Sequence, residues 1–181
     1  MQREEAAAIM DNAYNAALPA TLKLLKDTGV RWNSVFYMIR RALKLQAALD
    51  RYCAAWVKPD KDAYDLAQDF LDSEDWEELR HFEELLEPFE KATKNSEGNA
   101  LTGSNGALWE VLPTMDFLYK KLQKRADEVL NQPELFTDHY RRCINYGFGK
   151  LREYYTLADD SRLYAAAVAL HPCNRFDYFE H

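Results

Sequence analysis

The sequence contains few of the residues that build turns. It has six glycines and six prolines in 181 residues, fewer than a β-sandwich or barrel with many turns requires. No stretch alternates β-branched and polar residues in the way that half-buried strands do. Both absences favour a helical fold over a sheet.

Cross-links, leader segments and membrane spans are also missing. The three cysteines, Cys53, Cys143 and Cys173, are odd in number and form no Cys-x-x-Cys pair, which excludes a disulfide framework and a cysteine-based zinc site. The first residues are acidic where a signal peptide is basic, and no run reaches the ~18 apolar residues of a membrane span. We therefore expect an intracellular protein with no cofactor, no metal and no membrane partner.

Charge is unevenly distributed along the chain. Thirty acidic and 23 basic residues give a net charge of −7, which disfavours a protein whose whole role is to coat nucleic acid. One segment nevertheless carries basic residues at three- and four-residue spacing, which places them in a stripe on a helix that could contact phosphate. The alternative is an ordinary solvent face balanced by Asp127 and Glu128. The basic stripe consists of Lys120, Lys121, Lys124 and Arg125.

Apolar residues recur at three- and four-residue intervals in several segments, as in amphipathic helices. We predict an all-α fold, an irregular bundle of about six or seven helices, with a helical N-terminal segment over residues 1–26 and a helical domain over residues 27–181. The predicted helices cover residues 3–26 (split by Pro19), 35–56, 60–71, 72–94, 107–130, 134–156 and 160–170. Residues 95–106 are predicted to form a loop.

Two of these segments have well-defined expected core faces. The first is Val35, Met38, Ile39, Ala42, Leu45, Leu49, Tyr52, Cys53 and Trp56, and the second is Tyr140, Ile144, Phe148, Leu151 and Tyr155. Polar residues before the helices are expected to accept hydrogen bonds from the first backbone amides, and a glycine suits a left-handed stop. The predicted caps are Asn33 or Ser34, Asp72 or Ser73, and Asp159 or Asp160, and the predicted stop is Gly29.

The sequence contains no self-contained active site. The acidic clusters Glu77–Glu78, Glu83–Glu87 and Asp159–Asp160 are expected to be solvated faces or caps, because adjacent helical residues point about 100° apart. His171 and Cys173 lie two residues apart, but no third group for metal binding or nucleophilic catalysis is evident. We predict a protein that is not an enzyme by itself.

Several blocks of the sequence resemble, in the same order, those of hAT-superfamily transposases. They are DTGVRWNSVFYMIRRAL at 27–43, DWE at 75–77, LLEPFEKAT at 85–93, VLP at 111–113, KL with YY at 150–155, AAVALHP at 166–172 and DYF at 177–179. In that family a large all-helical insertion domain interrupts an RNase H-like catalytic domain, and the matching blocks belong to the insertion domain. The resemblance implies the same all-α fold and a nuclear location.

The resemblance also implies a role for the Arg-Trp pair. In the family this pair lies near the active site, where the Trp stabilises a DNA hairpin or a flipped base; here the role falls on Arg31 and Trp32. The family's catalytic carboxylates lie outside the matching blocks, its Cys-x-x-His motif is missing, and Val30 and Val35 replace threonines. The resemblance therefore implies a chain without catalytic activity of its own.

Three functions follow as hypotheses. The first is a truncated or domesticated hAT transposase-derived domain that binds structured DNA, such as a hairpin or transposon end. The second is a scaffold that binds a protein partner or self-associates and has no remaining DNA role. The third is an independent hydrolase using His171 or Cys173. An exposed Trp32 favours the first, and a buried Trp32 favours the second.

Overall fold

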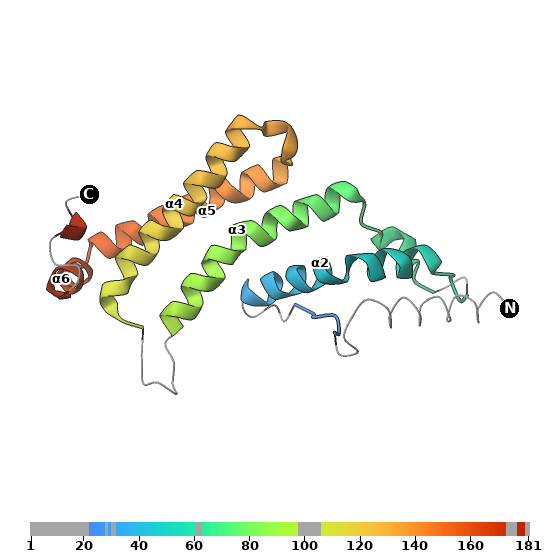
Figure 1. Ribbon diagram of the computed structural model, residues 1–181, viewed down its shortest axis with the longest axis horizontal. Helices are drawn as coiled ribbons and strands as arrows, with labels where there is room; N and C mark the ends of the chain where they lie inside the picture. Colours follow the sequence, from blue (N-terminus) through green and yellow to red (C-terminus); the bar gives the residue numbers. More distant parts are fainter. Residues whose placement is uncertain are drawn as a thin grey trace. The chain divides into compact units, whose positions relative to one another are not determined.

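The computed structural model of the protein describes residues 22–27, 29, 32–60, 63–97, 106–172 and 177–179. All regular structure in these residues is helical (Figure 1), which confirms the predicted all-α class. The α-helices are α2 (Trp32–Ala55), α3 (Ser73–Glu97), α4 (Val111–Asn131), α5 (Asp138–Asp159) and α6 (Arg162–Leu170). The 3-10 helices are η1 (Leu66–Asp69), η2 (Leu108–Glu110), η3 (Pro133–Leu135) and η4 (Asp177–Phe179).

The prediction of six or seven helices was wrong for the described part of the chain, which holds five α-helices. Residues 60–71 contain only the four-residue η1. Residues 22–27 are not helical, so the helix predicted over 3–26 does not reach residue 26. Residues 3–21, the rest of the predicted helix, lie outside the described residues.

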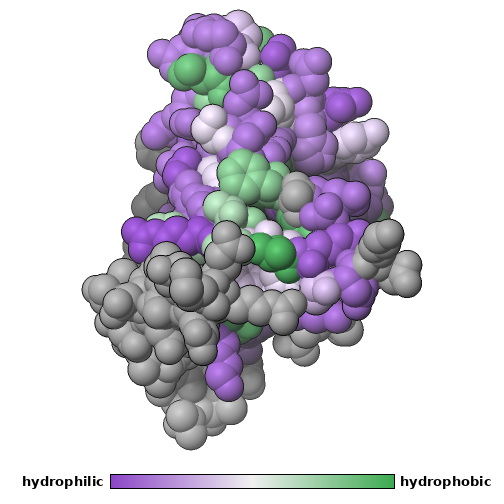
Figure 2. Space-filling view, turned by 90° about the vertical axis from the view of Figure 1, so that its right-hand side faces the viewer, coloured by the Kyte–Doolittle hydropathy of each residue, from purple (hydrophilic) through white to green (hydrophobic). Residues whose placement is uncertain are grey.

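The chain divides into two compact units, residues 1–83 and 84–181, and α3 runs through the division. The predicted domain 27–181 thus contains parts of both units, while its boundary at residue 26 stays a prediction. No helix among the described residues is long and apolar enough to cross a membrane. On the face shown in Figure 2, hydrophilic residues cover most of the described surface.

In the first unit, α2 packs against the first part of α3. The Trp76 side chain is 3% exposed, and its indole N–H donates a hydrogen bond to the Asp50 carboxylate at 3.0 Å. An Arg80 guanidinium nitrogen donates to the side-chain oxygen of Gln46 at 2.7 Å. Phe36 is fully buried on α2 although it was absent from the predicted core face, and Tyr52, which was predicted there, is exposed.

In the second unit, α4 and α5 form the tightest helix pair, and Leu122 lies at its centre. A Cβ added to Gly147 of α5 would lie 3.4 Å from a Leu122 methyl carbon, an ordinary van der Waals contact, so Gly147 faces Leu122 across the helix pair. The core of α5 contains Tyr140, Ile144 and Leu151, as predicted. Burial of these side chains supplies the main favourable free energy of folding.

A carboxylate anchors the C-terminal η4 to this helix pair. Both oxygens of Asp116 on α4 accept hydrogen bonds from tyrosine hydroxyls, one from Tyr155 of α5 and one from Tyr178 of η4. All three side chains are partly buried. Two phenol donors therefore satisfy one carboxylate that is partly withdrawn from water.

The helix termini test the predicted caps. The Asp72 carboxylate accepts hydrogen bonds from the amides of Glu74 and Asp75 at 2.8 and 2.9 Å, and this confirms the predicted cap of α3. The cap of α6 is Ser161 rather than Asp159 or Asp160, and the Ser161 side chain makes no capping hydrogen bond, because α5 extends through Asp159. The left-handed Gly29, with φ of 67°, is confirmed.

The Asp72 cap gives a stability prediction. Replacing Asp72 with Ala is expected to lower the free energy of unfolding by about 1 kcal/mol, because two backbone amides of α3 lose their acceptor. Replacing it with Asn retains an acceptor and is expected to cost only a few tenths of that value. Urea unfolding followed by circular dichroism measures both. Equal losses in the two variants would contradict a capping role.

The Asp116 anchor gives a pH prediction. Burial, followed by the hydrogen bond to Asp116, raises the pKa of Tyr155 and of Tyr178 above the usual value near 10. Because the folded-state pKa lies above the unfolded one, the stability from these hydroxyls is complete below about pH 10 and is lost as the pH rises beyond it. Tyrosinate absorbance should show a late-ionising class that becomes smaller in Asp116→Asn. An unchanged class in that variant would contradict the anchor.

Candidate nucleic-acid interface

Trp32 is the first residue of α2, and a side-chain-stabilised turn precedes it. The Asp27 carboxylate accepts hydrogen bonds from the Gly29 amide, at 3.0 Å, and from the Ser34 hydroxyl. Ser34 therefore lies inside the first turn of the helix and does not cap it as predicted. The Trp32 side chain is 40% exposed. A large aromatic surface is thus accessible at a helix N-terminus.

The helix that carries Trp32 is rich in positive charge. It contains four basic residues and one acidic residue, Asp50. Arg40 pairs with Glu83 at 3.4 Å and keeps 44% of its side chain exposed, while Arg41 donates a hydrogen bond to the Lys23 carbonyl. Arg31, the predicted partner of Trp32, lies outside the described residues. The accessible Trp and the basic residues of α2 belong to the first unit.

The predicted basic stripe lies on α4 in the second unit, and its four members differ in their surroundings. Lys120 is exposed. The Lys121 ammonium lies 5.4 Å from the centroid of the Phe117 ring. Lys124 is 73% exposed and lies 3.7 Å from Glu128. Arg125 is only 22% exposed. The stripe exists, but it is not a uniform free cationic surface.

Arg125 joins two helices through carboxylates. Its guanidinium donates hydrogen bonds to Glu84 of α3 and, at 2.7 Å, to Glu128 of α4. Burial by itself would lower the pKa of Arg125, but the hydrogen bond to Glu84 and the nearby negative charges outweigh it and raise the pKa. The balancing carboxylates are therefore Glu84 and Glu128, whereas Asp127 accepts a hydrogen bond from Gln123 instead. Spacing along one helix could not reveal Glu84, which is 41 positions away.

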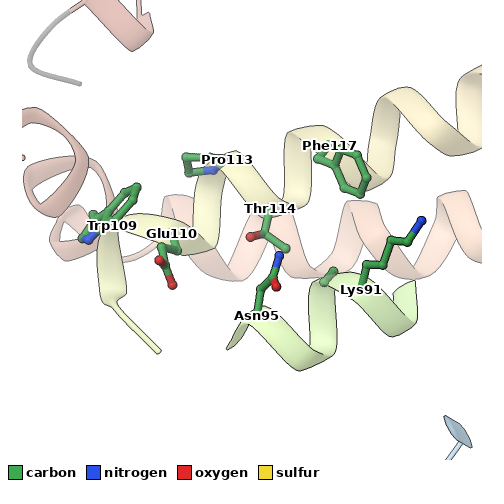
Figure 3. A pocket seen from close by; sticks show the side chains of 8 residues that line it. Lys91, Asn95, Trp109, Glu110, Pro113, Thr114 and Phe117 are labelled. Carbon is green, nitrogen blue, oxygen red and sulfur yellow. The ribbon is translucent and has the colours of Figure 1, made fainter. Parts of the chain in front are cut away.

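A cavity of about 540 Å³ lies between the last turns of α3 and the start of α4 (Figure 3). Trp109 and Phe117 supply aromatic walls, and Thr114 faces Asn95 across the opening. Its size falls within the range of small-molecule sites. Trp109 also stacks on His171, with ring centroids 4.0 Å apart, so the imidazole belongs to an aromatic pair.

The third hypothesis, a hydrolase using His171 or Cys173, stays a prediction. Cys173 lies outside the described residues, and the described part of the chain contains no group of three His, Cys, Asp or Glu side chains that could hold a metal. The predicted acidic faces of α3 take part in ion pairs. Glu83 pairs with Arg40, Glu84 with Arg125, and Glu87 with Lys91 at 3.1 Å.

Comparison with known proteins finds one similarity in sequence. The chain is 27% identical over 158 residues to "Putative transcriptional regulator tpeD" from the fungus Talaromyces stipitatus. The aligned region covers 86% of this chain but only 14% of that protein, so the chain spans about one seventh of its relative's length. No family model and no solved structure matches the chain.

The different surroundings of the stripe residues can be tested through stability. Arg125→Gln is expected to lower the free energy of unfolding by about 1–2 kcal/mol, because Glu84 and Glu128 lose a charged donor. The partial exposure of both carboxylates limits the loss. Lys120→Gln, at an exposed position, is expected to change it by less than about 0.5 kcal/mol. Urea unfolding measures both, and equal effects would contradict the described pairing of Arg125.

Proposed function

We propose that the chain is the helical insertion domain of a hAT transposase-derived protein, without catalytic activity of its own, and that it binds structured DNA through Trp32. The observation that carries the proposal is the exposure of Trp32 at the start of the basic helix α2. An indole in this position can stack on an unpaired base, and the basic residues further along α2 can attract phosphate. Such a protein would act in the nucleus.

Two further observations support this proposal. The all-helical structure agrees with the fold that the resemblance to the insertion domain implies. The fungal relative is named a putative transcriptional regulator, and transcriptional regulation is a process that takes place on DNA. The basic stripe contributes less to the proposal than Trp32, since Arg125 and Lys124 are paired with carboxylates.

The second function, a scaffold that binds a protein partner or a second copy, is favoured by one observation. Leu163 and Leu170 of α6 are 67% and 82% exposed, and α6 has no acidic or basic residue after Arg162. Protein partners commonly cover exposed apolar faces of this kind. The exposure of Trp32 favours the DNA function, and a DNA-binding measurement separates the two functions directly.

The DNA proposal is tested by fluorescence anisotropy with a labelled DNA hairpin and a blunt duplex at low and physiological salt. We expect the hairpin to bind more tightly than the duplex. Trp32→Ala is expected to weaken hairpin binding by about 1–3 kcal/mol, the value of one stacking contact, whereas Trp32→Phe keeps a ring and should lose less.

Trp109→Phe is the matched control, because Trp109 stacks on His171 and lies in the other unit. It should leave hairpin affinity unchanged. If the hairpin fails to bind even at low salt while Trp32→Ala remains folded, the DNA proposal is wrong, and the scaffold function is favoured.

A further inference from the structure

One face of α5 carries cations and aromatic rings in alternation. Arg142, Tyr146, Lys150 and Tyr154 follow one another at intervals of four residues, and all four are exposed. Tyr146 is 78% exposed and Tyr154 is 55% exposed. Four residues of α-helix rise about 6 Å, so these side chains form a continuous row that winds slowly around the helix. We call it the α5 row.

The α5 row lies on a helix that is held firmly from its other side. Tyr140, Ile144 and Leu151 of the same helix are buried in the core of the second unit. The rings of the row are therefore presented by a fixed backbone, and less conformational entropy is lost when a ligand binds them.

The cations of the α5 row keep donors available for a ligand. One guanidinium nitrogen of Arg142, Nε, donates to the Asp138 carbonyl at 3.3 Å, and the other two nitrogens carry four more N–H groups. The Lys150 ammonium lies 2.7 Å from the Glu153 carboxylate and 5.8 Å from the centroid of the Tyr154 ring. Only Glu153 among these contacts brings a negative charge next to the row.

We propose that the α5 row binds single-stranded nucleic acid, with bases stacked on Tyr146 and Tyr154 and phosphates held by Arg142 and Lys150. Aromatic side chains stack on any unpaired base, and alternating cations can follow the backbone. A duplex offers phosphates but keeps its bases stacked inside, so it cannot use the two rings. The α5 row belongs to the second unit and Trp32 to the first, and this proposal does not depend on the hairpin proposal.

The test is fluorescence anisotropy of labelled twelve-residue oligothymidylate with the full chain at low salt. Tyr146→Leu and Tyr154→Leu are each expected to weaken binding about 5- to 150-fold, the equivalent of one lost stacking contact. Tyr146→Phe keeps the ring and should bind like the wild type. Tyr64→Leu is the matched control, since Tyr64 is 61% exposed in the first unit.

Glu153→Gln provides a change in the opposite direction. It removes the negative charge beside Lys150 and is expected to strengthen binding, with the larger effect at low salt. Comparing oligouridylate with oligothymidylate shows whether the α5 row prefers RNA or DNA. Tight binding of either oligonucleotide supports the proposal. Circular dichroism establishes that each variant is folded.

Three results would overturn the proposal. They are duplex binding as tight as single-strand binding, equal losses in Tyr64→Leu and Tyr146→Leu, and failure of both oligonucleotides to bind. If both oligonucleotides fail to bind, a protein partner becomes the favoured ligand of the α5 row. The losses in Tyr146→Leu and Tyr154→Leu test this proposal, and the loss in Trp32→Ala tests the hairpin proposal, so the two proposals can fail independently.

Discussion

The close approach of α4 and α5 around Leu122 is the contact on which the second unit depends. Gly147 of α5 faces the Leu122 methyl groups in this contact. Tyr140, Ile144 and Leu151 place one face of α5 in the core. The residues of the α5 row lie outside that face and are exposed.

Carboxylates of α3 decide how much of the positive charge is available to a ligand. Glu83 pairs with Arg40 of α2, and Glu84 pairs with Arg125 of α4. These pairs engage Arg40 and Arg125 with carboxylates, in a chain whose net charge is already −7. Nucleic-acid binding by this chain would therefore depend on accessible rings supported by a few cations, unlike binding by a broad basic patch.

Patterns in the local sequence predicted most of the described helices, but they did not predict which side chains would be buried and which would be exposed. The Asp72 cap and the core face of α5 depend on residues within one or two turns, so spacing alone revealed them. Phe36 was missed because burial depends on what packs against α2. The pairing of Arg125 with Glu84 is likewise a tertiary contact. The four-residue spacing of the α5 row is present in the sequence, but the exposure of its side chains depends on how α5 packs.

We propose that aromatic rings make the main nucleic-acid contacts, Trp32 with hairpin DNA and the α5 tyrosines with single strands, and that the α4 stripe contributes less. The most direct measurement is a ¹H–¹⁵N NMR titration with the hairpin and then with oligothymidylate. The hairpin should shift the indole N–H signal of Trp32 and leave those of Trp76 and Trp109 in place. The single strand should shift amides of α5 around Tyr146 and Tyr154. Shifts confined to the residues around Lys120 and Lys124, or none at all, would contradict the account.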